Sequence, residues 1–370
     1  MYFRKYLLGI IATLVSIISS KNGLSFALLT KYSFGTNGSR IASFFVPFVN
    51  LGWYIIQAAT YGHFIALIFN LGSFGEGIAM IASALVMGVF ALSGMKAITI
   101  LGYVSIPAIV FLSIATSVKA IQITGGIEHI LSYRPSAPMA ISTGITAIIG
   151  TWILSSATCI ADIMRYAKNT RDAIASSLTG LLLGNSLMIL CGALAAIAVD
   201  NSDLPAVLLS MGLLIPSIIL MTTNIFTTNA ANLYSNSLNL SNSFNMDRKK
   251  MITILLIIAA IGTLTKPYEI NFLFTFLNTL GNIIPPLAGI IIADYFILNK
   301  GHYEDFNKVT FKNWNPLAFI TWIISLVLSF VLPFGLPALT SLISSIIIFP
   351  VLTIIVSKLN VKGGKNYEEI

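Results

Sequence analysis

Five polar side chains of the kind that bind ions and small polar molecules gather near the end of one apolar run. Asn224, Thr227 and Thr228 are spaced i, i+3 and i+4, so on a helix they share one face. Asn229 and Asn232 extend this face by about one turn. Hydroxyl and amide oxygens are neutral ligands, which suit a dehydrated monovalent cation such as Na⁺ and lack the charge that favours Ca²⁺. An asparagine amide also offers a donor and an acceptor that match the amide-like edge of a nucleobase.

The structural alternative for these residues is that they hold membrane helices together. Interhelical hydrogen bonds of this kind are worth about 0.6 kcal/mol on average. One or two polar residues would fit that role. Five within the nine positions 224–232 favour a binding site, because a polar group in hydrocarbon costs several kcal/mol unless it is paired or lines a cavity.

Two tryptophans lie inside apolar runs. Trp53 follows Gly52 and lies three residues after Asn50, and Trp152 lies three residues before Ser155. Tryptophan usually marks the membrane interface, which is the alternative role for both. Two facing aromatic rings would instead clamp a planar ligand, with stacking worth about 1–3 kcal/mol per base.

Charged residues in or near the apolar runs have simpler explanations. Asp162 and Arg165, spaced i, i+3, fit a structural pair at a helix end better than a proton relay. The remaining acidic residues of interest are expected in outer loops, where solvated charge is the default. They are Glu76, Glu128, Asp200, Asp203 and Glu269.

The sequence offers no arrangement typical of an enzyme. Its three histidines are scattered, and its two cysteines, Cys159 and Cys191, lie in apolar runs. No P-loop, HExxH, GxSxG or CxxC motif occurs. We therefore predict no catalytic residue, and any transport would use an ion gradient or be passive.

The elements that must position these residues are membrane-spanning helices. Apolar residues make up 56% of the 370-residue chain and charged residues 9%, against about 25% charge in soluble domains. A bilayer-crossing helix needs roughly 20 apolar residues, which predicts eleven spans and an all-α polytopic membrane protein. The predicted spans are 6–20, 41–69, 78–95, 98–119, 138–160, 174–199, 206–227, 251–265, 270–297, 316–333 and 338–357. The segment 21–40 is expected to be a loop with an interfacial helix.

The distribution of positive charge predicts an orientation. If the N-terminus is outside and the spans alternate, 16 of the 21 lysines and arginines fall on the inner side. This predicts a multi-pass protein of the cell membrane with its C-terminus in the cytoplasm. Arg4 and Lys5 conflict with an outer N-terminus. A preceding helix that enters from the cytoplasm would remove the conflict, so a first span is expected to be missing.

Several segments together resemble the cytosine permeases of the nucleobase:cation symporter-1 family, also called purine/cytosine permeases. The resemblance extends from residue 1 to about 357 and implies the LeuT-type inverted-repeat fold. The segments that carry it are "TNIFTTNAANLYSNSLNL", "NTLGNIIPPLAGIIIADYF", "GTWILSSATCIADIMRYAKN", "TKYSFG" and "VNLGW".

The same resemblance divides the chain, as one transporter domain 1–370, into four parts. The first repeat, 1–119, holds helices two to five and lacks the family's first helix, and the second repeat, 138–297, holds helices six to ten. Two further helices occupy 316–357, and a cytoplasmic tail follows at 358–370.

The resemblance also implies a site for a base. Trp53 matches a tryptophan that stacks on the base, and Asn50 stands where cytosine permeases tend to carry glutamine. Trp152 lies near an aromatic position on the opposite side of the base. The spacing after Trp152 is one residue longer than usual, which leaves the alignment of Thr151 and Ser155 open.

On the other predicted helix, the resemblance assigns a base-contacting amide and a sodium site. Asn229 matches the amide. Thr227 and Thr228 match the hydroxyls that bind Na⁺, and Asn224 matches a backbone carbonyl ligand. No cofactor other than the coupling ion is implied.

The expected function is import of a nucleobase, with cytosine as the first candidate, by cation symport and alternating access. Na⁺ is the first candidate for the cation and H⁺ the second. The expected partners are the small-molecule base and the lipid bilayer, with no nucleic acid and no obligate protein partner. Alternative cargoes are uracil, a purine, allantoin, hydantoin or thiamine. If the missing first span reflects a true truncation and not a miscalled start, the alternative is a membrane relic or interaction subunit that does not transport.

Overall fold

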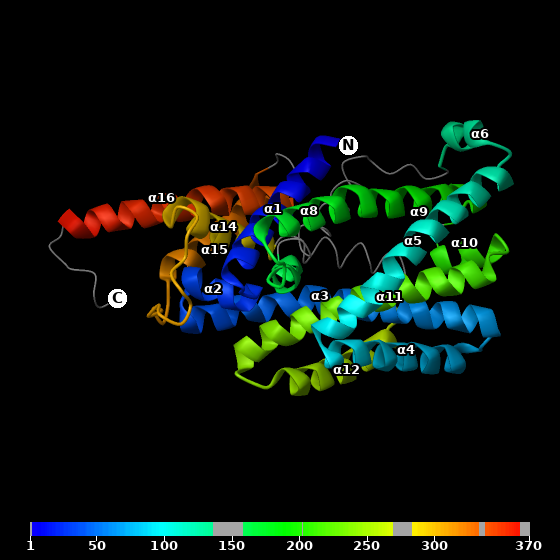
Figure 1. Ribbon diagram of the computed structural model, residues 1–370, viewed down its shortest axis with the longest axis horizontal. Helices are drawn as coiled ribbons and strands as arrows, with labels where there is room; N and C mark the ends of the chain where they lie inside the picture. Colours follow the sequence, from blue (N-terminus) through cyan, green and yellow to red (C-terminus); the bar gives the residue numbers. More distant parts are fainter. Residues whose placement is uncertain (1, 136–157, 202, 269–282, 333–336, 363–370) are drawn as a thin grey trace.

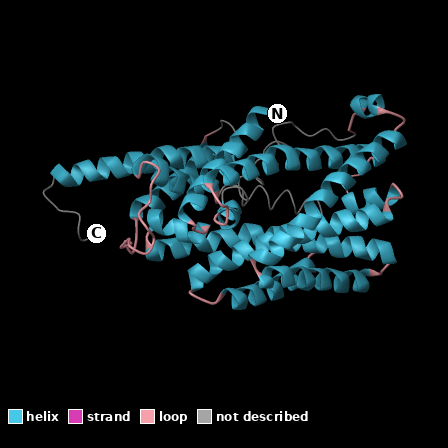
Figure 2. Cartoon of the chain, in the orientation of Figure 1, coloured by secondary structure: helices cyan, strands magenta, loops and turns pink. Residues whose placement is uncertain are grey.

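The computed structural model describes residues 2–135, 158–201, 203–268, 283–332 and 337–362. Over these ranges the backbone forms helices joined by loops and contains no strand (Figure 2). The predicted all-α class is therefore confirmed for the described part of the chain.

The first half of the chain forms a run of helices, and a second run follows the segment 136–157, which lies outside the described residues. The first run consists of α1 (Tyr2–Asn22), α2 (Phe26–Phe34), α3 (Thr36–Phe69), α4 (Ser73–Ser93), α5 (Met95–Ile123) and α6 (Ile127–Ser132). The second begins with helical residues 158–164 and continues with α8 (Thr170–Thr179), a π-helical turn η1 (Gly180–Gly184), α9 (Asn185–Val199), α10 (Leu204–Ser210), α11 (Leu214–Phe244), α12 (Arg248–Thr263), α14 (Pro285–Ala293), a π-helical turn η2 (Asp294–Leu298), α15 (Pro316–Val331) and α16 (Pro337–Lys362).

Several of these helices are long and apolar enough to cross a bilayer. Among the described residues, six meet that test, and the pair α1–α2, bent by 91°, is a seventh candidate. The six are Thr36–Phe69, Ser73–Ser93, Met95–Ile123, Thr170–Val199, Leu214–Phe244 and Pro337–Leu359. Most of the predicted span 138–160 and half of 270–297 lie outside the described residues. The number of eleven spans therefore stays a prediction.

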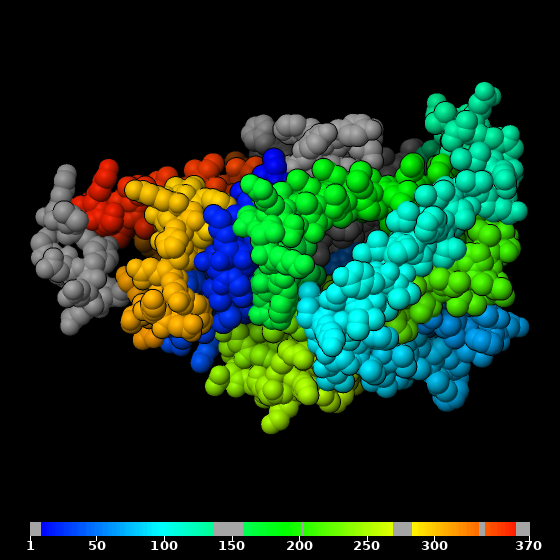
Figure 3. All heavy atoms as spheres, viewed as in Figure 1, coloured from blue at the N-terminus to red at the C-terminus, as the bar shows by residue number. Residues whose placement is uncertain are grey.

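The long helices run side by side along the length of the molecule (Figure 1). Helix α3 packs against both α4 and α11, and α5 lies across α11 on the face seen in Figure 3. The approach of α3 to α4 requires a glycine, because a Cβ atom at Gly62 would lie 2.4 Å from the Met80 Cα atom. Gly289 plays the same role between α14 and α16, where a Cβ atom would lie 2.7 Å from the Leu342 carbonyl oxygen.

In the described part of the chain, the two largest apolar clusters form most of the core, and α3 contributes to both. Ala42 and Val46 of α3 belong to a cluster formed with α1, α2, α14, α15 and α16. Tyr54, Ala58 and Phe64 belong to a cluster formed with α4, α11 and α12. The middle of α3, which carries the predicted base contacts, therefore lies between the two parts of the core.

Candidate substrate and cation site

Three polar or aromatic side chains follow one face of α3 at the junction of the two core clusters. Asn50 is 1% exposed, and its Nδ2 atom has no hydrogen-bond partner among the described residues. Trp53 packs against Val49 of the same helix and Ile284 just before α14. Gln57, one turn beyond Trp53, has a buried Oε1 atom without a partner. The spacing i, i+3, i+7 places Asn50, Trp53 and Gln57 on one side of the helix.

Gln57 is a candidate that the sequence analysis missed. The available signal was its position in "GWYIIQ", four residues after Trp53 and seven after Asn50. Helical spacing alone marks it as part of the same face. Its burial without a hydrogen-bond partner is visible only after the helices are packed.

Asn229 on α11 lies directly against this part of α3. It is fully buried, and its Nδ2 atom donates to the Tyr54 carbonyl oxygen at 3.1 Å and to the Met87 Sδ atom at 3.2 Å. A carbonyl oxygen only accepts, so the amide nitrogen must face Tyr54. The Asn229 Oδ1 atom is then left as an unpartnered acceptor. The structure thus brings Asn229 next to the residue that follows Trp53.

The unpartnered atoms are costly unless a ligand satisfies them. A buried polar atom without a partner costs about 1–3 kcal/mol, and Asn50 Nδ2, Gln57 Oε1 and Asn229 Oδ1 are three such atoms on two adjacent helices. They are one donor nitrogen and two acceptor oxygens; Asn50 and Gln57 share the face of α3 that carries Trp53, and Asn229 contacts the next residue, Tyr54. This is the complement of a planar ring that carries N–H and C=O groups.

The predicted cation ligands lie on α11 just before Asn229. The Thr228 hydroxyl donates to the Asn224 carbonyl oxygen at 2.9 Å, and the Thr227 hydroxyl donates to the Thr223 carbonyl oxygen at 2.5 Å. Because each hydroxyl hydrogen is used in this way, lone pairs of the hydroxyl oxygens remain available to a cation. The neutral oxygens of this turn fit Na⁺ as part of its coordination shell.

Ser105 lies beside the predicted cation ligands, which the spacing of residues in the sequence could not predict. Its hydroxyl oxygen, on α5, lies 2.8 Å from the Thr227 Oγ1 atom, and the side chain is fully buried. Among the described residues, no group of three or more histidine, cysteine, aspartate or glutamate side chains could hold a metal ion. The oxygens that the structure places at this turn of α11 are those of hydroxyl and backbone carbonyl groups.

The remaining predicted site residues are not described. Trp152, Thr151 and Ser155 lie in the range 136–157, outside the described residues. The place of Trp152 on the opposite side of the base stays a prediction, as do the roles of Thr151 and Ser155.

A buried carboxylate connects three helical segments at one end of the molecule. Asp162 is fully buried and accepts hydrogen bonds from the Phe26 backbone N–H at 2.9 Å and the Ser235 hydroxyl at 2.5 Å. In the described part of the chain, Arg165 turns elsewhere and donates to the hydroxyls of Tyr166 and Tyr234 at 2.7 Å and 2.9 Å. The structural role predicted for Asp162 fits, but its partners are α2 and α11 and not Arg165.

A second buried carboxylate fastens the other end of α2. Asp294, at the start of η2, accepts from the Ser33 hydroxyl at 2.9 Å and the Tyr303 hydroxyl at 2.8 Å. Burial, together with the Asp294 charge, raises the pKa of Tyr303 well above its ordinary value, so this phenol stays protonated and can donate. The short helix α2, expected as an interfacial helix, is therefore held by carboxylates from two other parts of the chain.

Glu76 corrects an expectation of the sequence analysis. Although it lies in the first turn of α4, which follows a loop, it is only 8% exposed. It accepts hydrogen bonds from the Lys266 ammonium at 2.6 Å and the Tyr268 hydroxyl at 2.8 Å, and the His63 Nδ1 atom lies 2.7 Å away. These partners come from α3 and from the segment after α12, so local sequence could not reveal them. The prediction of a solvated Glu76 was wrong.

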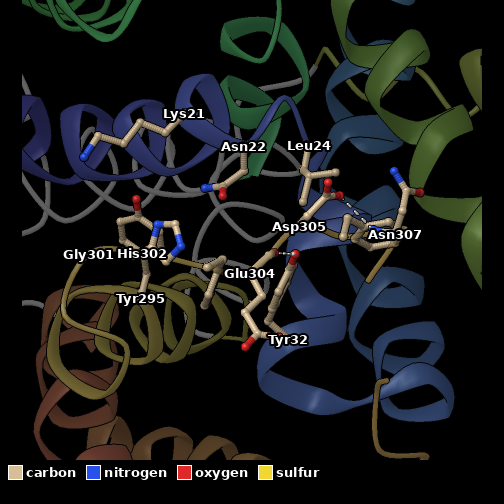
Figure 4. A pocket seen from close by; sticks show the side chains of 12 residues that line it. Lys21, Asn22, Leu24, Tyr32, Tyr295, Gly301, His302, Glu304, Asp305 and Asn307 are labelled. Atoms are coloured by element: carbon tan, nitrogen blue, oxygen red, sulfur yellow. Dashed lines mark hydrogen bonds between the residues drawn. The ribbon is translucent and has the colours of Figure 1, made fainter. Parts of the chain in front are cut away.

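A polar cavity of about 670 Å³ lies away from the predicted site, between the end of α1, α2 and the loop after η2 (Figure 4). Lys21, Asn22 and Tyr32 line it on one side and Glu304 and Asp305 on the other. The Tyr32 hydroxyl donates to the Glu304 carbonyl oxygen at 2.7 Å and so ties the loop to α2. None of the predicted base or cation contacts lines this cavity.

Long apolar helices that bury unpartnered amide atoms where two of them pack are typical of a membrane transporter. Residues 2–349 match the family described as "Permease for cytosine/purines, uracil, thiamine, allantoin". The chain belongs to this permease family and, like its relatives, is not an enzyme.

Individual relatives agree with the family. The chain is 31% identical to the cytosine permease of Escherichia coli (strain K12) over 353 residues, which cover 94% of this chain and 81% of the relative. Its fold is similar to that of Mhp1, a nucleobase-cation-symport-1 family transporter in a closed conformation with bromovinylhydantoin bound. The TM-score is 0.80 at 20% identity, covering 96% of this chain and 84% of Mhp1.

A more distant likeness extends to MhsT in complex with L-phenylalanine, with a TM-score of 0.61 at 12% identity, covering 94% of this chain and 87% of MhsT. The two solved structures show the fold alone, and they confirm the predicted LeuT-type transporter fold.

Proposed function

We propose that this protein imports a nucleobase, with cytosine as the preferred cargo, by symport with Na⁺. The identity to a cytosine permease supports the class of cargo. The observation that carries the proposal is the set of unpartnered buried amide atoms of Asn50, Gln57 and Asn229 beside Trp53. A base that stacks on Trp53 would meet hydrogen-bonding groups from both α3 and α11.

The balance of donors and acceptors favours cytosine over uracil. Cytosine carries an exocyclic amine where uracil carries a carbonyl oxygen, so cytosine presents more N–H groups. The oxygen atoms of Asn229 and Gln57 are two acceptors without a donor, whereas Asn50 contributes one unpartnered nitrogen, which carries two N–H groups. A site that would leave an acceptor unpaired discriminates against the analogue that lacks the donor. We propose Trp152 as the aromatic contact on the other side of the base, with Thr151 and Ser155 as further candidates whose alignment stays open.

The proposed coupling arises from the position of the cation ligands on α11. Asn224, Thr227 and Thr228 precede Asn229 within two helical turns. A Na⁺ ion bound by these oxygens would hold that segment of α11 in place and thereby orient the amide that contacts the base. Binding of each ligand would strengthen binding of the other, and this coupling is reciprocal by thermodynamic necessity. H⁺ is the second candidate for the coupling ion.

Alternating access requires contacts between helices that close one end of the molecule and that can break and form again. The hydrogen bonds of Asp162 to Phe26 and Ser235 are suited to this role, because they join separate helices and none of them is covalent. We place this end on the cytoplasmic side, in line with the distribution of lysine and arginine. The C-terminus would then be cytoplasmic and the beginning of α1 outside.

The test is uptake of radiolabelled cytosine by proteoliposomes that contain the 370-residue chain. Uptake should require an inward Na⁺ gradient, and unlabelled cytosine should compete better than uracil, purines, allantoin, hydantoin or thiamine. Uptake that is equally fast without Na⁺ but depends on a pH gradient would indicate that H⁺ is the coupling ion. Sodium-dependent binding without uptake would favour a membrane protein that does not transport. Absence of binding for every base in the panel would overturn the proposal.

A further inference from the structure

An apolar groove of about 390 Å³ lies on the outside of the helices that carry the site. All the side chains that line it are apolar, and they come from α3, α11, α12 and the short loop between α11 and α12. Phe44 and Phe48 form one wall, Ile254 and Ile258 form the other, and Phe244 at the end of α11 lies between them. Each of these five side chains is at least 36% exposed. The groove is therefore open to whatever surrounds the protein.

Each wall of the groove is a stripe along one helix. Phe44 and Phe48 are spaced i, i+4 on α3, and Ile254 and Ile258 have the same spacing on α12. In both helices, the residue one turn earlier on the same stripe is basic. It is Arg40 on α3 and Lys250 on α12, and both are exposed.

The two cations lie at the same end of the groove. Helix α11 ends at Phe244 and α12 begins only four residues later, at Arg248. The Ser243 hydroxyl, one residue before the end of α11, donates to the Arg40 carbonyl oxygen at 2.8 Å. The beginnings of α3 and α12 therefore meet at the end of α11, as the lower left of Figure 1 also shows. The groove has an apolar body and a positively charged mouth.

We propose that the groove binds an anionic phospholipid, with an acyl chain along the two stripes and the phosphate between Arg40 and Lys250. The protein lies in a bilayer, which supplies molecules of this shape at high local concentration. A zwitterionic lipid fits the apolar body equally well but neutralises the cations less. A free phosphate has no group for the apolar body, and the two exposed cations would be screened by salt. The charge at the mouth therefore selects the headgroup, and the apolar walls select a lipid.

A lipid in the groove would stabilise the helices that carry the proposed base site, on the side facing away from that site. It contacts the α3 segment next to Asn50 and joins α3 to α12 across the end of α11. A lipid there would stabilise the packing of the two site-bearing helices without touching the base. This inference does not depend on which base or cation the protein carries.

The test measures lipid binding to the delipidated chain in detergent by native mass spectrometry. Dioleoyl phosphatidylglycerol should bind more tightly than dioleoyl phosphatidylcholine, whose acyl chains are the same. Arg40→Gln and Lys250→Gln should each weaken phosphatidylglycerol binding about five-fold, the effect of one basic residue near an anionic membrane surface. Lys250→Arg should retain most of the binding.

Lys249→Gln is the matched control, because Lys249 is also exposed but lies on the neighbouring stripe of α12, with Thr253 one turn later. It should change binding less than two-fold. Ile254→Trp, which fills the groove, should lower the binding of both lipids, and glycerol 3-phosphate should not compete. Circular dichroism and gel filtration establish that the variants are folded.

Three results would overturn the proposal. One is equal binding of the two lipids, and another is an equal loss in Lys249→Gln and Lys250→Gln. The third is a change from dimer to monomer in Ile254→Trp with lipid binding intact, which would assign the groove to a second copy of the chain.

Discussion

Replacing Asn229 by alanine should weaken base binding far more than it weakens the fold. The substitution removes the Oδ1 acceptor, which has no partner within the described protein, and the Nδ2 donor, which bonds to the Tyr54 carbonyl oxygen. Loss of a neutral hydrogen bond to the base is worth about 1.4 kcal/mol, or a ten-fold increase in Kd. Loss of the bond to Tyr54 should cost the fold about 0.6 kcal/mol, the average for such bonds in membranes.

The matched control for this prediction lies on the same helix. Asn242 also donates from α11 to α3, to the Ser43 Oγ atom at 3.1 Å, but it lies more than three turns from Asn229. Asn242→Ala should therefore cost about as much stability as Asn229→Ala while leaving the Kd for the base within two-fold. The comparison separates contact with the base from packing of α3 against α11.

The assay combines equilibrium binding of tritiated cytosine in saturating Na⁺ with thermal unfolding of the same detergent-solubilised samples. Equal effects of the two alanine variants on the Kd would refute the assignment of Asn229 to the base. A tight-binding Asn229→Ala protein would do the same. A variant that unfolds below the assay temperature is replaced by Asn229→Ser, which also removes the amide acceptor.

Three further predictions concern the cation, the aromatic contact and the charged cluster. Thr228→Ala should raise the Na⁺ concentration needed for half-maximal cytosine binding, and an unchanged sodium dependence would remove Thr228 from the cation site. Trp53→Ala should make the binding free energy of every base that binds less favourable by about 1–3 kcal/mol, the value of one stacking contact. Weaker binding of one base alone would indicate a different role for Trp53. Glu76→Gln should lower stability by about 1 kcal/mol, because the partly exposed Lys266 loses its ion pair at 2.6 Å. Its thermal unfolding should become less sensitive to salt than that of the wild-type protein.

Much of the candidate site could be predicted because helical spacing is a local property. Asn224, Thr227 and Thr228 share a face wherever the helix lies, since 3.6 residues complete each turn. The same reasoning placed Asn50 and Trp53 together on α3. The membrane class followed from composition alone, because a chain with 9% charged residues cannot cover a soluble surface.

The predictions for Glu76 and Asp162 were wrong about their partners, because those partners lie far away in the chain. Glu76 was expected in solvent, but Lys266 and Tyr268, about 190 residues later, enclose it. Asp162 was paired with Arg165 by spacing, whereas its partners are Phe26 and Ser235 on other helices.

The sequence by itself determined that this protein is an all-helical membrane permease with a polar face on α11 and an amide and an indole on α3. Only the tertiary structure decided that Asn229 lies against Tyr54, that Ser105 lies next to Thr227, and that the Oε1 atom of Gln57 is buried without a partner among the described residues. The physical reason is that a helix fixes the relative positions of its own side chains, while the contacts between helices depend on how they pack. The packing of the helices depends on small residues such as Gly62 and on the apolar clusters on either side of α3. Which helices these residues bring into contact cannot be predicted from the spacing of residues along the chain.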